Sequence, residues 1–225
     1  KHDRLVSRIL EIMLGILTWS LLLSPVWLGI LFPQAVVYVL TLLTVYWSYM
    51  AFTHTFGLFM GYKQYREEMA TDWYLKCQKL DFSSLPEPET RPKYLSDIRH
   101  MILIPVVNEP EAVLRDSIFS IFNQTLPTSQ ICMVFTVEQK YSEEVIERIK
   151  NIIGDREKDL HSIMFFIHPA GIPGEAIGDG GANRAWGSSH AVEELKKRGD
   201  NLRNFIFGNI DSDHVLNKQY LARLT

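Results

Sequence analysis

The sequence predicts a membrane-anchored α/β protein, and two observations indicate this fold class. Residues 12–62 contain no Asp, Glu, Lys or Arg. From about residue 98 onward, short apolar runs of strand length alternate with amphipathic helical patterns. Such alternation is typical of a mostly parallel sheet with right-handed crossover connections. We therefore expect two transmembrane helices followed by one α/β domain over residues 98–225.

The uncharged stretch is too long for a single membrane crossing. As one helix it would be more than twice as long as the hydrocarbon core, which is about 30 Å thick. Phe32-Pro33-Gln34 forms the natural turn, so we predict transmembrane helices over 12–32 and 35–60. A signal peptide would be shorter and would carry a cleavage site with small residues. A buried helix pair would retain some charge on an exposed face.

Basic residues flank this hairpin at both ends but are missing from its turn. They are Lys1, Arg4 and Arg8 before the first helix, and Lys63 and Arg66 after the second. By the positive-inside rule, both ends lie in the cytoplasm. We therefore expect an integral protein of the cell or inner membrane. Residues 1–11 would form a cytoplasmic tail, and the domain after residue 62 would also face the cytoplasm.

Residues 63–97 are predicted to connect the membrane to the α/β domain. Apolar residues recur there at helical spacing: Tyr65, Met69, Trp73, Cys77 and Leu80. This pattern favours an amphipathic helix that lies against the lipid headgroups or packs on the soluble domain. The three prolines of residues 85–92 predict a stiff linker, with a domain boundary near residue 95.

Four apolar runs are predicted to be strands buried on both faces. They cover residues 100–107, 130–137, 161–168 and 201–210. Helices are expected between them: one begun by Asn108-Glu109-Pro110-Glu111, one over 142–153 and one over 182–198. Capping residues, an early proline and early acids favour the first of these helix starts. A glycine-rich loop over 170–181 precedes the last helix.

Acidic residues follow three of the four predicted strands. They are Glu109, Glu138 and the pair Asp211 and Asp213, which His214 follows. Because ligands of open α/β sheets bind at the carboxyl ends of the strands, we expect these side chains at one site. Paired carboxylates suit Mg²⁺ or Mn²⁺, which often also holds a substrate phosphate. The same D-x-D pattern also fits an Asp-rich turn without function.

Other classes of protein fit the sequence less well. A dinucleotide-binding G-x-G-x-x-G is not formed, because Gly178 and Gly180 are followed by Asn183, and no Walker A loop is present. The net charge of −3 and the lack of a basic stripe argue against nucleic acid as a partner. Cys77 and Cys132 lack metal-ligand spacing and are predicted to be reduced thiols.

Three motifs taken together resemble a known family. They are Ile104-Pro105-Val106-Val107-Asn108-Glu109-Pro110, Ala182-Asn183 at a helix start, and Asp211-Ser212-Asp213-His214. In this order they resemble the nucleotide-binding half of membrane-integrated family 2 glycosyltransferases, the group of cellulose, chitin and hyaluronan synthases. The resemblance covers about residues 98–225. It implies a GT-A fold and an inverting transfer of sugar from a nucleotide-diphospho-sugar to a polysaccharide or lipid-linked acceptor.

The resemblance also implies roles for individual residues. Asn108 and Glu109 would both bind the substrate, with Glu109 near the nucleoside, and Glu138 would contact the base or the ribose. Asp213 would be the direct ligand of Mg²⁺ or Mn²⁺, and Asp211 would lie nearer the ribose and diphosphate. His214 would sit beside the metal.

Two departures from the family pattern stand in the sequence. Asn183 matches the polar residue that opens the helix, but Asp179 occupies the glycine loop where the family has a basic residue for the diphosphate. Arg184, about one turn further on, is the expected substitute. The catalytic base and the Q-x-x-R-W motif are expected beyond residue 225, as parts of a longer protein, so this segment alone should be inactive. The alternative is a degenerate synthase-like membrane subunit that scaffolds a complex.

Overall fold

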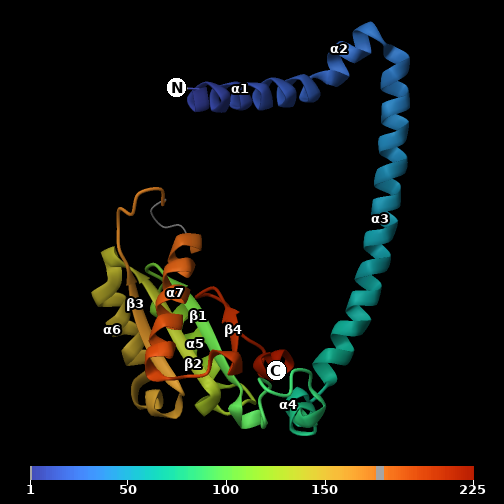
Figure 1. Ribbon diagram of the computed structural model, residues 1–225. Coiled ribbons are helices and arrows are strands. Elements are labelled where there is room, and N and C mark those ends of the chain that lie inside the picture. The colour runs from blue at the N-terminus through green and yellow to red at the C-terminus, as the bar shows by residue number, and fades with distance from the viewer. Residues whose placement is uncertain (1, 176–179) are drawn as a thin grey trace. The chain divides into compact units, whose positions relative to one another are not determined.

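The computed structural model describes residues 2–175 and 180–225 (Figure 1). The chain divides into two compact units, Lys1–Thr71 and Asp72–Thr225. The division comes well before the boundary that the prolines predict near residue 95. The proline-rich segment therefore groups with the α/β unit, in which an Arg203 guanidinium nitrogen lies 4.0 Å from the Glu87 carboxylate.

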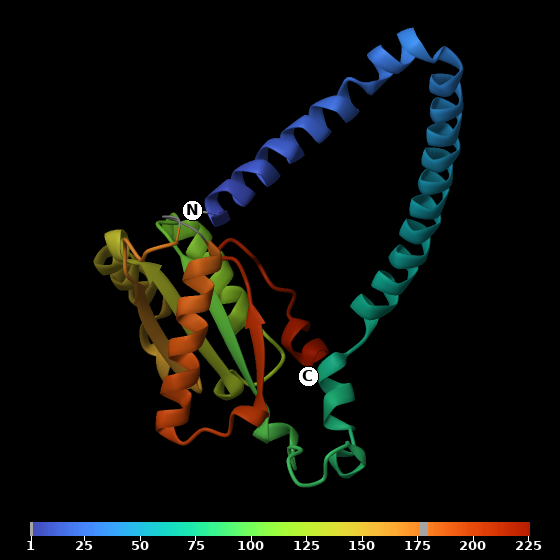
Figure 2. The ribbon, with the colours of Figure 1, turned by 45° about the horizontal axis from the view of Figure 1, so that its top comes forward.

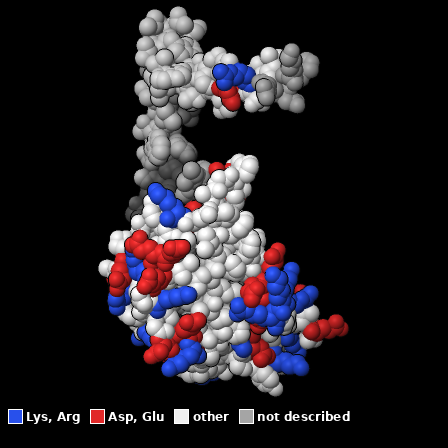
Figure 3. Space-filling view, turned by 90° about the vertical axis from the view of Figure 1, so that its left-hand side faces the viewer, with Lys and Arg blue, Asp and Glu red and all other residues white. Residues whose placement is uncertain are grey.

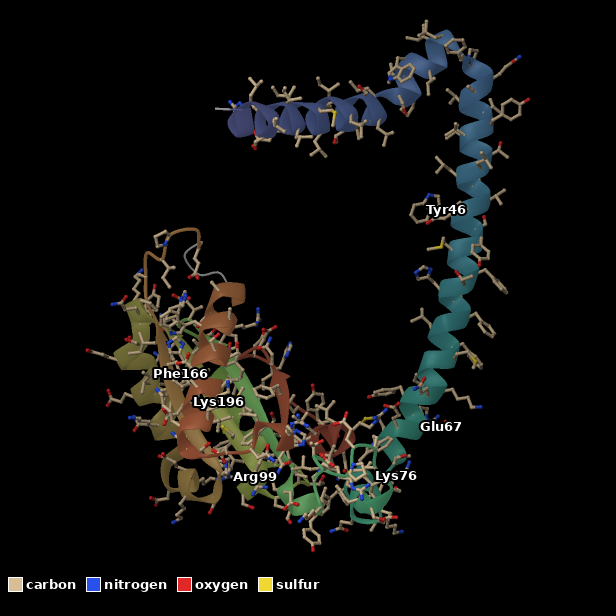
Figure 4. All side chains as sticks on the ribbon, viewed as in Figure 1. Tyr46, Glu67, Lys76, Arg99, Phe166 and Lys196 are labelled. Atoms are coloured by element: carbon tan, nitrogen blue, oxygen red, sulfur yellow. The ribbon has the colours of Figure 1, made fainter. Side chains whose placement is uncertain are left out.

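The first unit consists of helices. They are α1 (His2–Leu22), α2 (Ser24–Leu31) and α3 (Pro33–Ala70). By length and composition, two of them could cross a membrane, over Leu5–Leu22 and Pro33–Ala70. Side chains project from α3 in every direction around Tyr46 (Figure 4), and its large apolar residues are mostly exposed. Two helices of membrane length are thus present as predicted, while their orientation stays a prediction.

The bounds of these helices differ from the predicted ones. α1 already begins at His2, so the expected tail of residues 1–11 is largely helical. The first span also does not continue to Phe32, because Pro25 lies in the first turn of a new helix, α2. Proline lacks the N–H that a helix interior requires but fits the first turn well.

The single amphipathic helix expected around residues 65–80 is wrong. α3 ends at Ala70, and a separate helix α4 (Trp73–Gln78) follows. Asp72 starts α4 by accepting a hydrogen bond from the Leu75 amide at 3.0 Å. Cys77 of α4 is buried and donates to the carbonyl of Ala222 at 3.2 Å. Of the two predicted placements, packing on the α/β unit is therefore the one that α4 adopts.

The second unit contains a four-stranded, all-parallel sheet in the order β3-β2-β1-β4. The strands are β1 (Arg99–Val106), β2 (Ile131–Glu138), β3 (Ser162–His168) and β4 (Phe205–Asn209). This confirms the predicted α/β class with a parallel sheet. β4 is shorter than predicted, because Leu202–Asn204 forms a 3-10 turn that Asn201 caps.

Helices cover both faces of the sheet (Figures 1 and 2). The helices α5 (Glu111–Phe122) and α6 (Ser142–Ile153) share one core with Ile102 and Ile104 of β1. On the opposite face, α7 (Gly180–Arg198) shares a second core with Met101 and Leu103. Alternate residues of a buried strand thus serve the two cores. α7 also passes over β3, where the Phe166 ring lies 5.8 Å from that of His190 (Figure 4).

One helix start differs from the prediction. α5 begins at Glu111, and Pro110 precedes it as the N-cap residue with an extended backbone, φ −59° and ψ 148°. The predicted capping residue, Asn108 or Glu109, is therefore wrong. Val107 and Asn108 instead form the bend that follows β1, and this bend brings Glu109 back to the sheet edge.

Both cysteines are free and buried, as expected for reduced thiols. Burial raises the pKa of the Cys132 thiol to about 11 and also raises the pKa of Cys77. Only a thiolate is an effective nucleophile. Both thiols therefore serve packing.

His100 makes the stability of the α/β unit depend on pH. It is buried within β1, where its Nε2 lies 2.8 Å from the Thr225 hydroxyl. Burial lowers the pKa of this imidazole from 6.5 to about 4. The unfolded chain takes up the proton at a higher pH than the folded chain. The contribution of His100 to the free energy of unfolding is therefore complete above pH 6.5 and is lost as the pH falls to 4. It amounts to about 3 kcal/mol.

A His100→Gln variant keeps a polar contact for the hydroxyl and removes this titration. Between about pH 7.5 and pH 4, the wild-type Tm is expected to fall by about 8 °C more than that of the variant. Thermal melts of both proteins across that range provide the measurement. Equal falls in the two proteins would show that His100 does not cause the pH dependence.

Candidate functional site

A cavity of ≈ 320 Å³ opens at the carboxyl edge of the sheet. It is lined by Pro105, Val107, Glu109, Glu138, Gly180, Asn183, Arg184, Asp211, Ser212 and Asp213. The chain passes from β1 outward to β2 and β3, and then returns to place β4 on the other side of β1. The cavity therefore lies at the point where strand order reverses, which is where open α/β sheets bind ligands.

The loop after β4 gathers three potential metal ligands. Oxygen or nitrogen atoms of Asp211, Asp213 and His214 all lie within 4.8 Å of one another. A tight turn produces this arrangement, because the His214 amide donates to the Asp211 carbonyl at 3.0 Å. The two interpretations of the D-x-D pattern are thus compatible, since the residues form a turn and also present a cluster suited to a hard cation.

Asp211 and Asp213 differ in their surroundings. Arg184 from the first turns of α7 forms an ion pair with the Asp211 carboxylate. His214 Nε2 lies 3.8 Å from the same carboxylate. Within the described chain, no hydrogen bond or ion pair engages Asp213, which is exposed. Asp213 is therefore the carboxylate more available to a cation.

Glu109 connects the tip of β1 to the loop after β4 that carries Asp211 and Asp213. One carboxylate oxygen accepts a hydrogen bond from the Ser212 hydroxyl, and the other accepts one from the Val107 amide, both at 2.9 Å. In addition, Arg148 donates to the Glu109 carbonyl at 2.6 Å. The carboxylate lines the cavity, but its hydrogen bonds are used to hold the loop between the two aspartates.

Asn183 fixes the start of α7 to the sheet. The side chain is buried, and its amide nitrogen donates to the Thr136 carbonyl of β2 at 3.2 Å. Its Oδ1 and the Nε of Arg184 are buried without a hydrogen-bond partner among the described residues. Buried polar atoms of this kind are rare in native proteins. In this cavity they offer one acceptor and one donor to a ligand.

The cavity as a whole is acidic. Its lining includes the carboxylates of Glu109, Glu138, Asp211 and Asp213 against the single guanidinium of Arg184. A phosphate alone would be repelled here, whereas a divalent cation would reverse the balance. Elsewhere, basic and acidic groups are mixed over the face of the α/β unit seen in Figure 3.

The structure thus brings together most of the residues chosen from the sequence. Two of them do not line the cavity: Asn108 is exposed in the bend after β1, and His214 is exposed beside the two aspartates. Asp179 and the middle of the glycine loop lie outside the described residues. The role predicted for them is therefore still a prediction.

Two further residues at this edge, Ser212 and His168, were placed at strand ends by the sequence but were given no role. Ser212 lies between the two aspartates and bonds Glu109. His168 ends β3 and contacts Glu138, its register partner on β2. The register of the parallel strands β2 and β3 was the only signal that could have paired Glu138 with His168.

Fold and site together define a class: an α/β protein with an acidic cavity at the switch point of a parallel sheet, preceded by two helices of membrane length. No model of a known protein family matches the chain, and a comparison with curated proteins yields no significant match. The function must therefore be argued from the site itself.

Proposed function

We propose that this chain is the donor-binding half of a membrane-bound glycosyltransferase with a GT-A fold, similar to the family 2 synthases. It would bind a nucleotide-diphospho-sugar together with Mg²⁺ or Mn²⁺. The observation that carries this proposal is the cluster of Asp211, Asp213 and His214, whose two carboxylates line the cavity at the switch point of the sheet. Such a position and such ligands suit a metal-bound diphosphate.

The lining residues divide between the two ends of such a donor. At one end, Glu138 accepts hydrogen bonds from the ribose or base. At the other end, Arg184 and the start of α7 face the diphosphate, and Arg184 also pairs with Asp211. A divalent cation held by Asp213 and Asp211 would neutralise the negative charge that develops on the departing diphosphate.

The proposed reaction is a displacement at the anomeric carbon. The acceptor hydroxyl forms the new glycosidic bond while the bond from that carbon to the diphosphate oxygen breaks, so the configuration inverts. The proton of the hydroxyl passes to a carboxylate that we expect beyond residue 225. We expect the acceptor to be a growing glycan or a lipid-linked saccharide, because a chain with two helices of membrane length would act beside a lipid bilayer.

Calorimetric titration of the detergent-solubilised chain with uridine 5′-diphosphate tests the proposal. With Mn²⁺ present, we expect saturable binding with a Kd below about 1 mM. With a chelator in place of Mn²⁺, we expect binding to disappear, because the carboxylates of the cavity would repel the diphosphate. The same titration with adenosine 5′-diphosphate measures the contribution of the base.

The scaffold alternative predicts a different result. The acid at position 179 and the pairing of Arg184 with Asp211 favour a degenerate site, because both reduce the positive charge available to phosphate. A degenerate subunit would give no metal-dependent binding of either nucleotide. That outcome would replace the enzyme proposal with the scaffold.

A further inference from the structure

A buried histidine lies next to the cavity but does not line it. His168 ends β3, and its side chain is 6% exposed. Its Nδ1 lies 3.4 and 3.5 Å from the two carboxylate oxygens of Glu138, and its Nε2 lies 3.0 Å from Glu175. The Trp186 ring of α7 packs against the imidazole, with 5.7 Å between the ring centroids and an interplanar angle of 70°. The ring is therefore held from three sides.

The hydrogen-bond donors that the imidazole can offer decide how it contacts the two carboxylates. An ionised carboxylate only accepts hydrogen bonds, and a neutral imidazole donates from only one nitrogen. Only the imidazolium form donates toward Glu138 and Glu175 at the same time. In that form, its positive charge offsets the cost of burying the Glu138 carboxylate, which is 9% exposed.

The Glu138 carboxylate keeps capacity for a ligand. Its Oε1 has no hydrogen-bond partner among the described residues, and the contacts to His168 are long. A ligand O–H or N–H in the cavity would supply the missing donor. His168 meanwhile would limit the directions in which the carboxylate can turn. The nucleoside end of the cavity thus depends on a residue that no nucleoside would touch.

We propose that His168 is a positioning residue that holds the Glu138 carboxylate correctly aimed for the nucleoside, with Glu175 as its anchor. This inference rests on the proposed function, because it assigns the nucleoside to Glu138. It predicts that His168 affects binding of the nucleoside part of the donor and not binding of the diphosphate. A residue with a merely structural role would affect both parts equally.

The test compares two probes in the full chain with Mn²⁺: uridine 5′-diphosphate and inorganic pyrophosphate. His168→Gln is expected to weaken nucleotide binding about tenfold, the loss of one hydrogen bond to a charged group, and to leave pyrophosphate binding unchanged. His161→Gln is the matched control. It removes a histidine before the opposite end of β3, where Nε2 lies 3.4 Å from Asp200. No change in either probe is expected for that control.

Two further variants guard against misfolding and show whether His168 acts through Glu138. Glu175→Gln changes a side chain that is 35% exposed, so the fold should persist. We expect about threefold weaker nucleotide binding, because a neutral amide still accepts from Nε2. In a Glu138→Gln background, His168→Gln should cause no additional loss.

The outcomes separate the two proposals. If the wild type binds neither probe in a metal-dependent way, the proposed function fails, and this inference fails with it. If the wild type binds both probes, the function stands. In that case, equal losses for nucleotide and pyrophosphate in His168→Gln, or losses that add to those of Glu138→Gln, would overturn the positioning role alone.

Discussion

Replacing Asp213 with asparagine is expected to weaken Mn²⁺-dependent binding of uridine 5′-diphosphate by about 100-fold or more. The substitution keeps the shape of the side chain and removes the carboxylate that is most available to a cation. Asp213 is exposed at the cavity. Because the change does not disturb a described internal contact, the fold and Tm should stay the same. Calorimetry with nucleotide and metal measures the loss.

Asp116→Asn is the matched control for this experiment. Asp116 lies exposed on α5 and does not line the cavity, so the variant removes the same charge elsewhere. Its binding should equal that of the wild type. Asp211→Asn should also weaken binding, but it frees Arg184 at the same time, so its loss should be smaller. An Asp213→Asn protein that binds nucleotide and metal like the wild type would refute the metal assignment.

Replacing Gly187 with alanine is expected to cost the α/β unit about 3 kcal/mol. Gly187 lies in α7 where this helix packs on the centre of the sheet. A Cβ there would overlap the Thr136 hydroxyl and lie 2.9 Å from Leu103 Cδ1 and 3.0 Å from Thr136 Cβ. Thr136 is completely buried in β2, so neither partner can move aside. Urea unfolding of the full chain in detergent measures the loss.

Two variants show whether the close approach is the cause. Gly208→Ala makes the same change in β4, where the new Cβ would meet its nearest atom at 3.9 Å. That variant should remain within about 0.5 kcal/mol of the wild type. Adding Thr136→Ala to Gly187→Ala removes the worst overlap and should restore part of the stability. A Gly187→Ala protein as stable as Gly208→Ala would show that α7 can move away from the sheet at no cost.

The strands could be predicted from the sequence because local pattern determines them. Apolar runs such as Met101–Ile104 fit only a strand buried between two layers of helices, and α6 has the predicted bounds of Ser142–Ile153. Helix ends were predicted less well. Pro25 lies in the first turn of a new helix and Asp72 caps another, and such helix starts depend on backbone geometry that apolar periodicity does not register.

The candidate site was predicted in part for the same reason. Residues at or just past the end of a strand, such as Glu138 and Asp211, must lie at the carboxyl edge of a parallel sheet. Their contacts were not predictable. The bend after β1 leaves Asn108 exposed. It also lets both carboxylate oxygens of Glu109 accept hydrogen bonds from within the protein. That bend depends on where α5 begins.

The sequence by itself determined an α/β chain with two apolar helices and a set of carboxylates at strand ends, because these follow from composition and short-range periodicity. Tertiary structure alone decided which of these groups meet. The strand order β3-β2-β1-β4 opens the cavity between β1 and β4, and the register of β2 and β3 pairs Glu138 with His168. Such pairings join residues far apart in the chain. They depend on packing free energy, and no local pattern encodes it.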